Sequence, residues 1–153
     1  MELLQAIEQL GPVRLLKSSF LAYPIVNAFH IAAIGGLFTS ALLMDLAVLR
    51  AIRSVPREKF VALLRRVALG AFVIAAFTGL ALFSIQATTY ARNPAFLLKL
   101  GVIGLAVLNF LAFSILSRRS PNGETSTATR FCAVASILLW SGVLLCGRLI
   151  GFV

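Results

Sequence analysis

The sequence predicts an all-α integral membrane protein, a four-helix bundle preceded by a short amphipathic interfacial helix. Of its 153 residues, 60% are hydrophobic and 12% are charged, and the mean hydropathy is +1.00. Soluble domains average about 45–50% apolar and about 25% charged residues, so this composition excludes a water-soluble domain. The apolar residues also gather in four long runs. The chain length fits a single membrane domain, 1–153.

Each of the four apolar runs is long enough to cross a bilayer as a helix. The runs cover residues 21–44, 67–86, 94–116 and 131–153. At about 1.5 Å per residue the first run spans roughly 36 Å, more than the hydrocarbon core of about 30 Å. None of the runs shows the alternation of a membrane β-strand. We therefore expect four membrane-spanning helices, with Pro94 as the first residue of the third.

The first nineteen residues are amphipathic and differ from these runs. Between Met1 and Leu10 the apolar side chains share one side of a helix, and the glutamates and glutamines share the other. Gly11 and Pro12 interrupt this helix, which resumes at Val13. We expect residues 1–19 to lie along the membrane surface as an interfacial helix.

Lysines and arginines are distributed unequally between the two ends of the expected helices. Nine lie in the connections 45–66 and 117–130, and five lie on the opposite side. Because cytoplasmic loops are enriched in basic residues, we expect both connections in the cytoplasm and both termini in the periplasm of a bacterial inner membrane. The net charge of +9 is likewise attributed to basic residues at the cytoplasmic side of the membrane. We expect the lipid bilayer as a partner and do not expect nucleic acid. A homo-oligomer or a larger membrane complex is a further possible partner.

Polar residues inside the first run mark a candidate site. Tyr23, Asn27 and His30 share one helix face at the spacing i, i+4, i+7. An ionisable residue within a membrane is costly, and it is a functional-site hypothesis by default. His30 is the only histidine of the chain, and it is a candidate ligand of a haem or metal ion, or a proton carrier. The alternative is a neutral imidazole that hydrogen-bonds between helices.

Two cations are expected at the same level as His30. Lys99 lies one turn into the third run, and Arg148 lies one turn from the end of the fourth. With His30 they would form a cationic pocket for a carboxylate, a haem propionate or a quinone oxygen. The alternative is that these long side chains extend to the interface. Trp140 lies nearer the middle of its run than the edge, so we expect it to pack inside the bundle or to line a cofactor cavity.

Two further polar residues have mainly structural interpretations. Asp45 ends the first run five residues before Arg50, and we expect it to form an ion pair that fixes the helix end. A proton relay is the alternative for Asp45. Asn109 is expected to bridge two helices through a hydrogen bond.

Several motifs together resemble a family of bacterial inner-membrane proteins. They are Tyr23-Pro-Ile-Val-Asn-Ala-Phe-His30, Asp45-Leu-Ala-Val-Leu-Arg50, Asn93-Pro-Ala-Phe-Leu-Leu-Lys99 with Asn109, 136–140 and Gly147-Arg148. The pattern resembles a four-helix family described as a domain of unknown function, over nearly the whole chain. That family commonly carries Glu in place of Asn27, so the resemblance does not imply a carboxylate beside the histidine here. The layout is also distantly similar to copper-resistance D membrane proteins and to four-helix b-type cytochromes.

Three functions follow as alternatives. The first is a redox-associated protein with a haem b or quinone site near His30. Met44 lies about 21 Å from His30 along the same helix, too far to be the second axial ligand of a haem. One histidine per chain therefore implies a five-coordinate haem or a haem shared by two chains. The second is copper handling by His30 with Cys146, although Cu(I) selects Cys and Met clusters that the sequence lacks. The third is a non-catalytic subunit or assembly factor. The sequence carries no catalytic motif such as H-E-x-x-H, so no enzyme activity is expected from the chain on its own.

Overall fold

The computed structural model describes residues 2–52, 56–118 and 126–152, and within these ranges the chain forms helices and no strands. The helices are α1 (Glu2–Glu8), α2 (Gly11–Ser18), α3 (Ala22–Val48), α4 (Arg57–Ile85), α5 (Ala87–Tyr90), α6 (Pro94–Arg118) and α7 (Thr127–Leu149). Four of them, α3, α4, α6 and α7, are long and apolar enough to cross a membrane. The predicted all-α, four-helix membrane fold is thereby confirmed.

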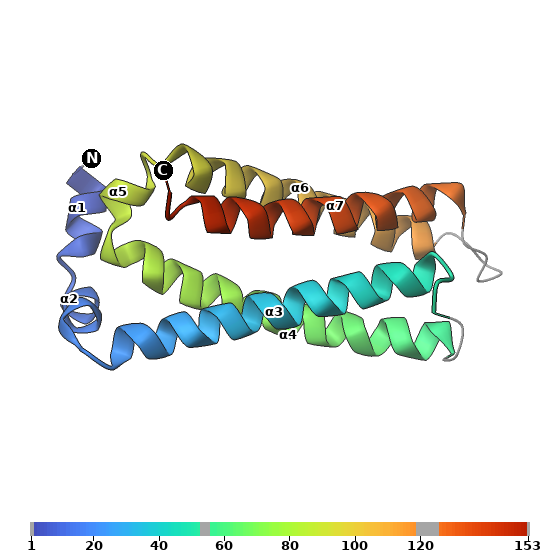
Figure 1. The fold of residues 1–153 in the computed structure, drawn as a ribbon, viewed down its shortest axis with the longest axis horizontal. Coiled ribbons are helices and arrows are strands. Elements are labelled where there is room, and N and C mark those ends of the chain that lie inside the picture. Colours follow the sequence, from blue (N-terminus) through green and yellow to red (C-terminus); the bar gives the residue numbers. More distant parts are fainter. Residues whose placement is uncertain (1, 53–55, 119–125, 153) are drawn as a thin grey trace.

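The four long helices run side by side along the longest axis of the molecule (Figure 1). The short helices α1, α2 and α5 gather with the chain's two ends at one end of the bundle, which we call the terminal end. The opposite end, where α3 and α6 finish and α4 and α7 begin, is called the connecting end. This arrangement leaves each long helix antiparallel to the next one in the sequence.

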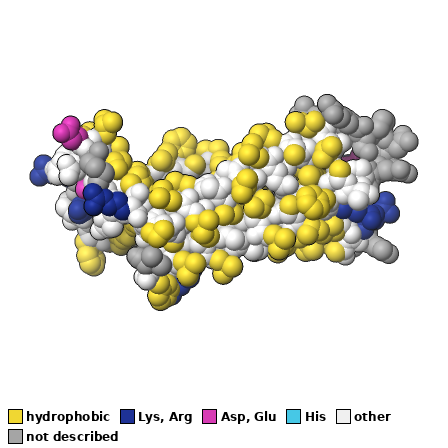
Figure 2. Space-filling view, turned by 90° about the horizontal axis from the view of Figure 1, so that it is seen from above, with side chains coloured by type: hydrophobic (Ala, Val, Ile, Leu, Met, Phe, Trp, Pro, Cys, Tyr) yellow, Lys and Arg dark blue, Asp and Glu magenta, His cyan; other side chains and the backbone are white. Residues whose placement is uncertain are grey.

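Packing divides the bundle into two hairpins. Helix α3 packs mainly against α4, α6 packs mainly against α7, and the α3–α7 contact joins the two pairs. A buried cluster at this junction is formed by Val48, Phe113, Cys132 and Ala133. Apolar side chains also cover the outside of the bundle, while charged groups gather at its two ends (Figure 2). This outward distribution of apolar groups is the one expected where lipid is the solvent.

The helices extend beyond the apolar runs at the connecting end. Helix α4 begins at Arg57 instead of residue 67, α7 begins at Thr127 instead of residue 131, and α3 continues to Val48. An apolar run marks the part of a helix that is suited to hydrocarbon, whereas backbone hydrogen bonding continues into the polar interface. Helix α7 shows how its early start is stabilised, because the Ser126 side chain accepts a hydrogen bond from the Thr129 N–H at 3.2 Å.

Helix α3 ends in a Schellman motif. The N–H of Ala51 donates to the Leu46 carbonyl at 2.9 Å, and the N–H of Arg50 donates to the Ala47 carbonyl at 3.2 Å. Arg50 adopts the left-handed conformation that this motif requires, with φ of 62°. The motif satisfies carbonyl groups that would otherwise be left open at the helix end, and it turns the chain sharply after α3.

Two features of the terminal end agree with the sequence. The N-terminal segment forms two short helices, α1 and α2, as expected, but the break lies at Gln9 and Leu10, and Gly11 and Pro12 belong to the first turn of α2. Pro94 is the first residue of α6, and the Asn93 side chain caps that helix by accepting a hydrogen bond from the Phe96 N–H at 3.0 Å. These elements fix the position of the chain beside the candidate site.

Candidate functional site

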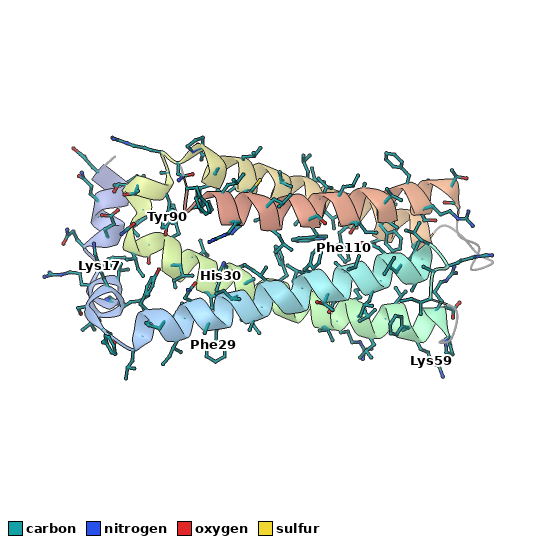
Figure 3. The ribbon with its side chains drawn as sticks, viewed as in Figure 1. Lys17, Phe29, His30, Lys59, Tyr90 and Phe110 are labelled. Carbon is teal, nitrogen blue, oxygen red and sulfur yellow. The ribbon has the colours of Figure 1, made fainter. Side chains whose placement is uncertain are left out.

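His30 lies in the terminal half of the bundle and faces α4. Its Nδ1 lies 2.9 Å from the hydroxyl oxygen of Thr78. Figure 3 shows His30 directed into the bundle, whereas the neighbouring Phe29 points outward. The polar residue in an apolar run therefore faces protein and not lipid, as membrane burial requires.

The Thr78 hydroxyl determines which nitrogen of His30 carries the proton. That hydroxyl donates its own proton to the Ile74 carbonyl at 2.7 Å, so it can only accept from the imidazole. The carbonyl of Ala75 also serves as an acceptor for the ring. This arrangement favours Nδ1 as the donor, in which case Nε2 of a neutral imidazole carries the lone pair.

Gly79 makes the space in which the imidazole lies. A Cβ atom built on Gly79 would lie 3.0 Å from His30 Cε1, which is tighter than most Cβ contacts in proteins. The glycine that follows Thr78 thus permits the close approach of α3 and α4 at this level. Gly79 was expected from the sequence to allow close backbone approach, whereas Thr78 was not identified, although a Thr-Gly pair inside an apolar run is the signal that marks it.

Lys99 approaches His30 from the other hairpin. The Lys99 side chain is partly buried, and its Nζ lies 3.6 Å from the position that a Cβ on Gly147 would occupy. Lys99 lies within electrostatic range of both His30 and Cys146. The structure therefore brings together an imidazole from α3, an ammonium from α6 and a small-residue surface on α7.

Tyr23 and Asn27 lie on α3 between His30 and the terminal end. Tyr23 is 44% exposed, and Asn27 is partly buried. Tyr23 lies close enough to Tyr90 of α5 that, together with burial as the larger cause, it raises the pKa of Tyr90 above 10.0. Tyr90 belongs to an aromatic cluster in which Phe83 and Phe96 stack at 5.4 Å. Tyr90 lies nearer the terminal end than His30 (Figure 3).

Arg148 does not join the His30 and Lys99 group. Its side chain is exposed, and its guanidinium carbon lies 4.9 Å from the centre of the Phe152 ring. A cation over an aromatic face near the helix end is the interfacial alternative described above. Of the two cations expected near His30, Lys99 is the one directed toward it.

Trp140 lines a cavity of about 230 Å³ that lies toward the connecting end. All four long helices contribute to its wall, which consists of Leu37, Ala41, Met44, Asp45, Ala68, Leu69, Phe72, Val107, Asn109, Phe110, Leu111, Phe113, Cys132, Ser136 and Trp140. His30 and Lys99 are not part of this wall. The bundle therefore contains two separate polar groups of residues, one around His30 and one around Asp45.

Asp45 lies near the end of α3 and faces inward. It is 4% exposed, and its carboxylate receives a side-chain hydrogen bond from Ser136 of α7. Its Oδ2 atom is buried and has no hydrogen-bond partner in the described part of the chain. The ion pair that was expected to fix the helix end stays a prediction. The structure places the carboxylate on a cavity wall, because Asp45 lies on the face of α3 that packs against α7.

Asn109 forms the interhelical bridge that was expected of it. Its side-chain N–H donates to the backbone carbonyl of Cys132 at 2.9 Å, which connects α6 with α7. In the described residues no group of three or more His, Cys, Asp or Glu side chains gathers to hold a metal ion. A copper site at His30 and Cys146 would therefore need further ligands that are not His, Cys, Asp or Glu side chains of the described residues.

No protein-family model, curated protein or solved structure matches this chain.

Proposed function

We propose that this protein is a redox-associated membrane protein that binds a quinone-type group between His30 and Lys99. The observation that carries the proposal is the contact of His30 Nδ1 with a Thr78 hydroxyl that donates to Ile74, because this pairing favours the tautomer in which Nε2 is a hydrogen-bond acceptor. Lys99 supplies hydrogen-bond donors from the other hairpin. An acceptor beside a donor suits a group that exchanges hydroxyl and carbonyl oxygens when it gains or loses two electrons and two protons.

Each residue of the site would have a distinct hydrogen-bonding role toward the quinone. The Nε2 atom of His30 would accept from a hydroxyl of the reduced form, and the Nζ of Lys99 would donate to a carbonyl of the oxidised form. Thr78 holds the imidazole in the required tautomer, and Gly79 permits its position. Haem b is the other redox group that this imidazole suits, because the Nε2 lone pair would serve as an axial ligand.

The position of the site in the bundle supports a lipid-soluble ligand. The site lies in the terminal half, and the outward faces of the spanning helices are apolar. With nine basic residues on one side and five on the other, we place the terminal end in the periplasm of a bacterial inner membrane. A hydrophobic quinone would then reach His30 from the outer leaflet.

The test is the content of redox groups in the purified full chain. Detergent-purified protein is extracted for quinone and is also recorded as oxidised and dithionite-reduced absorption spectra, after expression with haem supplied. We expect quinone in near-stoichiometric amount, with loss in His30→Ala and Lys99→Met. Arg148→Gln is the matched control, because it removes a cation at the same end that points away from the site.

The outcomes separate the alternatives. A Soret band that disappears in His30→Ala would replace quinone by haem b as the ligand. Retention of quinone in both site variants would place the ligand elsewhere and overturn the proposal. A protein with neither group leaves the non-catalytic subunit or assembly factor, for which native purification would show partner chains.

A further inference from the structure

The cavity at the connecting end contains one acidic group in an otherwise apolar surface. Its walls are formed mainly by aliphatic and aromatic side chains, and Asp45 contributes a carboxylate. Asp45 is the only aspartate of the chain. Neither His30 nor Lys99 belongs to this wall, so the cavity is independent of the function proposed above.

The carboxylate is only partly satisfied by the protein. Ser136 supplies one hydrogen bond, whereas the buried Oδ2 atom has no partner among the described residues. A buried carboxylate is costly unless it is paired or fully hydrogen-bonded. The open acceptor atom lies on the wall of a cavity. A positively charged ligand with N–H donors would supply the hydrogen bond and the opposite charge that this atom lacks.

The remaining walls suit the apolar body of such a ligand. Phe72, Phe110 and Trp140 present aromatic surfaces to the cavity, and aromatic rings attract organic cations as well as apolar groups. Arg65 approaches one wall, with its guanidinium carbon 5.8 Å from the centre of the Phe110 ring, but it is not a lining residue. Asp45 is thus the charged group of the wall.

We propose that this cavity binds small lipophilic amines in their protonated form, with the ammonium group on Oδ2 of Asp45 and the apolar body against Trp140 and Phe72. The cavity volume of about 230 Å³ exceeds the roughly 150 Å³ of an engineered protein cavity that takes up benzene. A single substituted benzene ring with a short amine chain therefore fits.

The chain contains its own reporter for this binding. Trp140 is the only tryptophan, and it lines the cavity, so its fluorescence reports occupancy without a label. The detergent-purified full chain is titrated with 2-phenylethylamine at neutral pH and, separately, with the uncharged 2-phenylethanol. We expect a saturable change for both ligands and an affinity for the amine at least about tenfold higher.

Two substitutions distinguish charge recognition from simple partitioning into an apolar space. Asp45→Asn is expected to lower amine affinity to that of the alcohol while leaving alcohol binding unchanged. Glu58→Gln is the matched control, because it removes a carboxylate at the exposed start of α4 and should change neither ligand. Ala41→Leu adds volume to the cavity wall and should abolish the response to both.

The proposal fails if the amine and the alcohol bind equally well, or if Asp45→Asn retains the amine preference. It also fails if Ala41→Leu binds both ligands like the unmodified chain, because the ligands then partition elsewhere. A fluorescence change that never saturates would also show that the ligands partition non-specifically, and the proposal would fail. Should Asp45→Asn fail to fold, the comparison of amine, alcohol and Ala41→Leu in the aspartate-containing chain still decides the question.

Discussion

Glu8 and Thr88 connect two parts of the terminal end that are far apart in the sequence. Oε1 of Glu8 accepts a hydrogen bond from the Thr88 N–H at 2.8 Å and another from the Thr88 hydroxyl at 2.7 Å. The acceptor lies at the end of α1 and the donors lie in α5. This contact fastens the amphipathic N-terminal segment to the linker between α4 and α6.

Replacement of Glu8 by alanine should release α1 from α5, because both hydrogen bonds lose their acceptor. We expect faster amide hydrogen exchange in residues 2–18 and unchanged exchange in the centres of α3 and α7. Glu2→Ala serves as the control, since Glu2 lies in the first turn of the same helix and is exposed. Equal exchange in both variants would show that the Glu8 contact does not hold the segment.

The same contact should depend on pH. The hydrogen bonds from Thr88 hold the pKa of Glu8 below 4.5, so they favour the charged carboxylate. A carboxyl group whose pKa is lower in the docked state stabilises docking fully above pH 4.5, and this stabilisation is lost as the pH falls through the lowered value. Exchange in residues 2–18 should therefore rise on acidification, and Glu8→Gln should remove most of this pH dependence.

Gly79→Ala should displace the His30 ring. The added Cβ would lie 3.0 Å from Cε1, so we expect the imidazole to shift slightly relative to Thr78. Gly70→Ala is the matched control in the same helix, because a Cβ there meets nothing within 4 Å. We expect the imidazole NMR resonances to shift in Gly79→Ala and quinone content to fall with them, while Gly70→Ala leaves both unchanged.

Asn109→Ala should loosen the α6–α7 hairpin. The variant loses the hydrogen bond to the Cys132 carbonyl, and such interhelical bonds in membranes contribute about 0.6 to 2 kcal/mol. A free energy of unfolding lowered by that amount, measured by denaturation in mixed micelles, would agree. Leu108→Ala is the control for an outward-facing neighbour, and a larger loss there would assign the effect to packing.

The terminal end is expected on the periplasmic side because most basic residues lie at the connecting end. Alkaline phosphatase fused after the last residue should be active in a bacterial host, and green fluorescent protein at the same position should stay dark. The reverse pair of results would invert the bundle. It would also move the His30 site to the cytoplasmic leaflet.

The four-helix fold could be predicted from the sequence because a helix that crosses lipid requires a long, continuous run of apolar residues. Four apolar runs became four long helices, and Pro94 began α6 as expected. The starts at Arg57 and Thr127 were missed because a helix does not end where its apolar run ends. Backbone hydrogen bonds continue into the interface, where charged side chains no longer cost energy.

The site residues show which part of the prediction needed coordinates. A histidine in an apolar run had to face protein, and His30 does. Its partner Thr78 depends on how the faces of α3 and α4 meet, which the pattern of one chain does not contain. Lys99 and Arg148 have equally flexible side chains, so only packing against Gly147 and Phe152 separates their directions.

The division of the bundle into two hairpins bears on how the chain assembles. The α3–α4 and α6–α7 pairs each join neighbours in the sequence, so each can close early with a small loss of loop entropy. Among the long helices, the later docking of α3 against α7 brings together segments that are distant in the sequence. A chain divided after Arg92 would keep α1–α5 in one fragment and α6–α7 in the other. The two fragments, expressed together, should therefore recombine into the complete bundle.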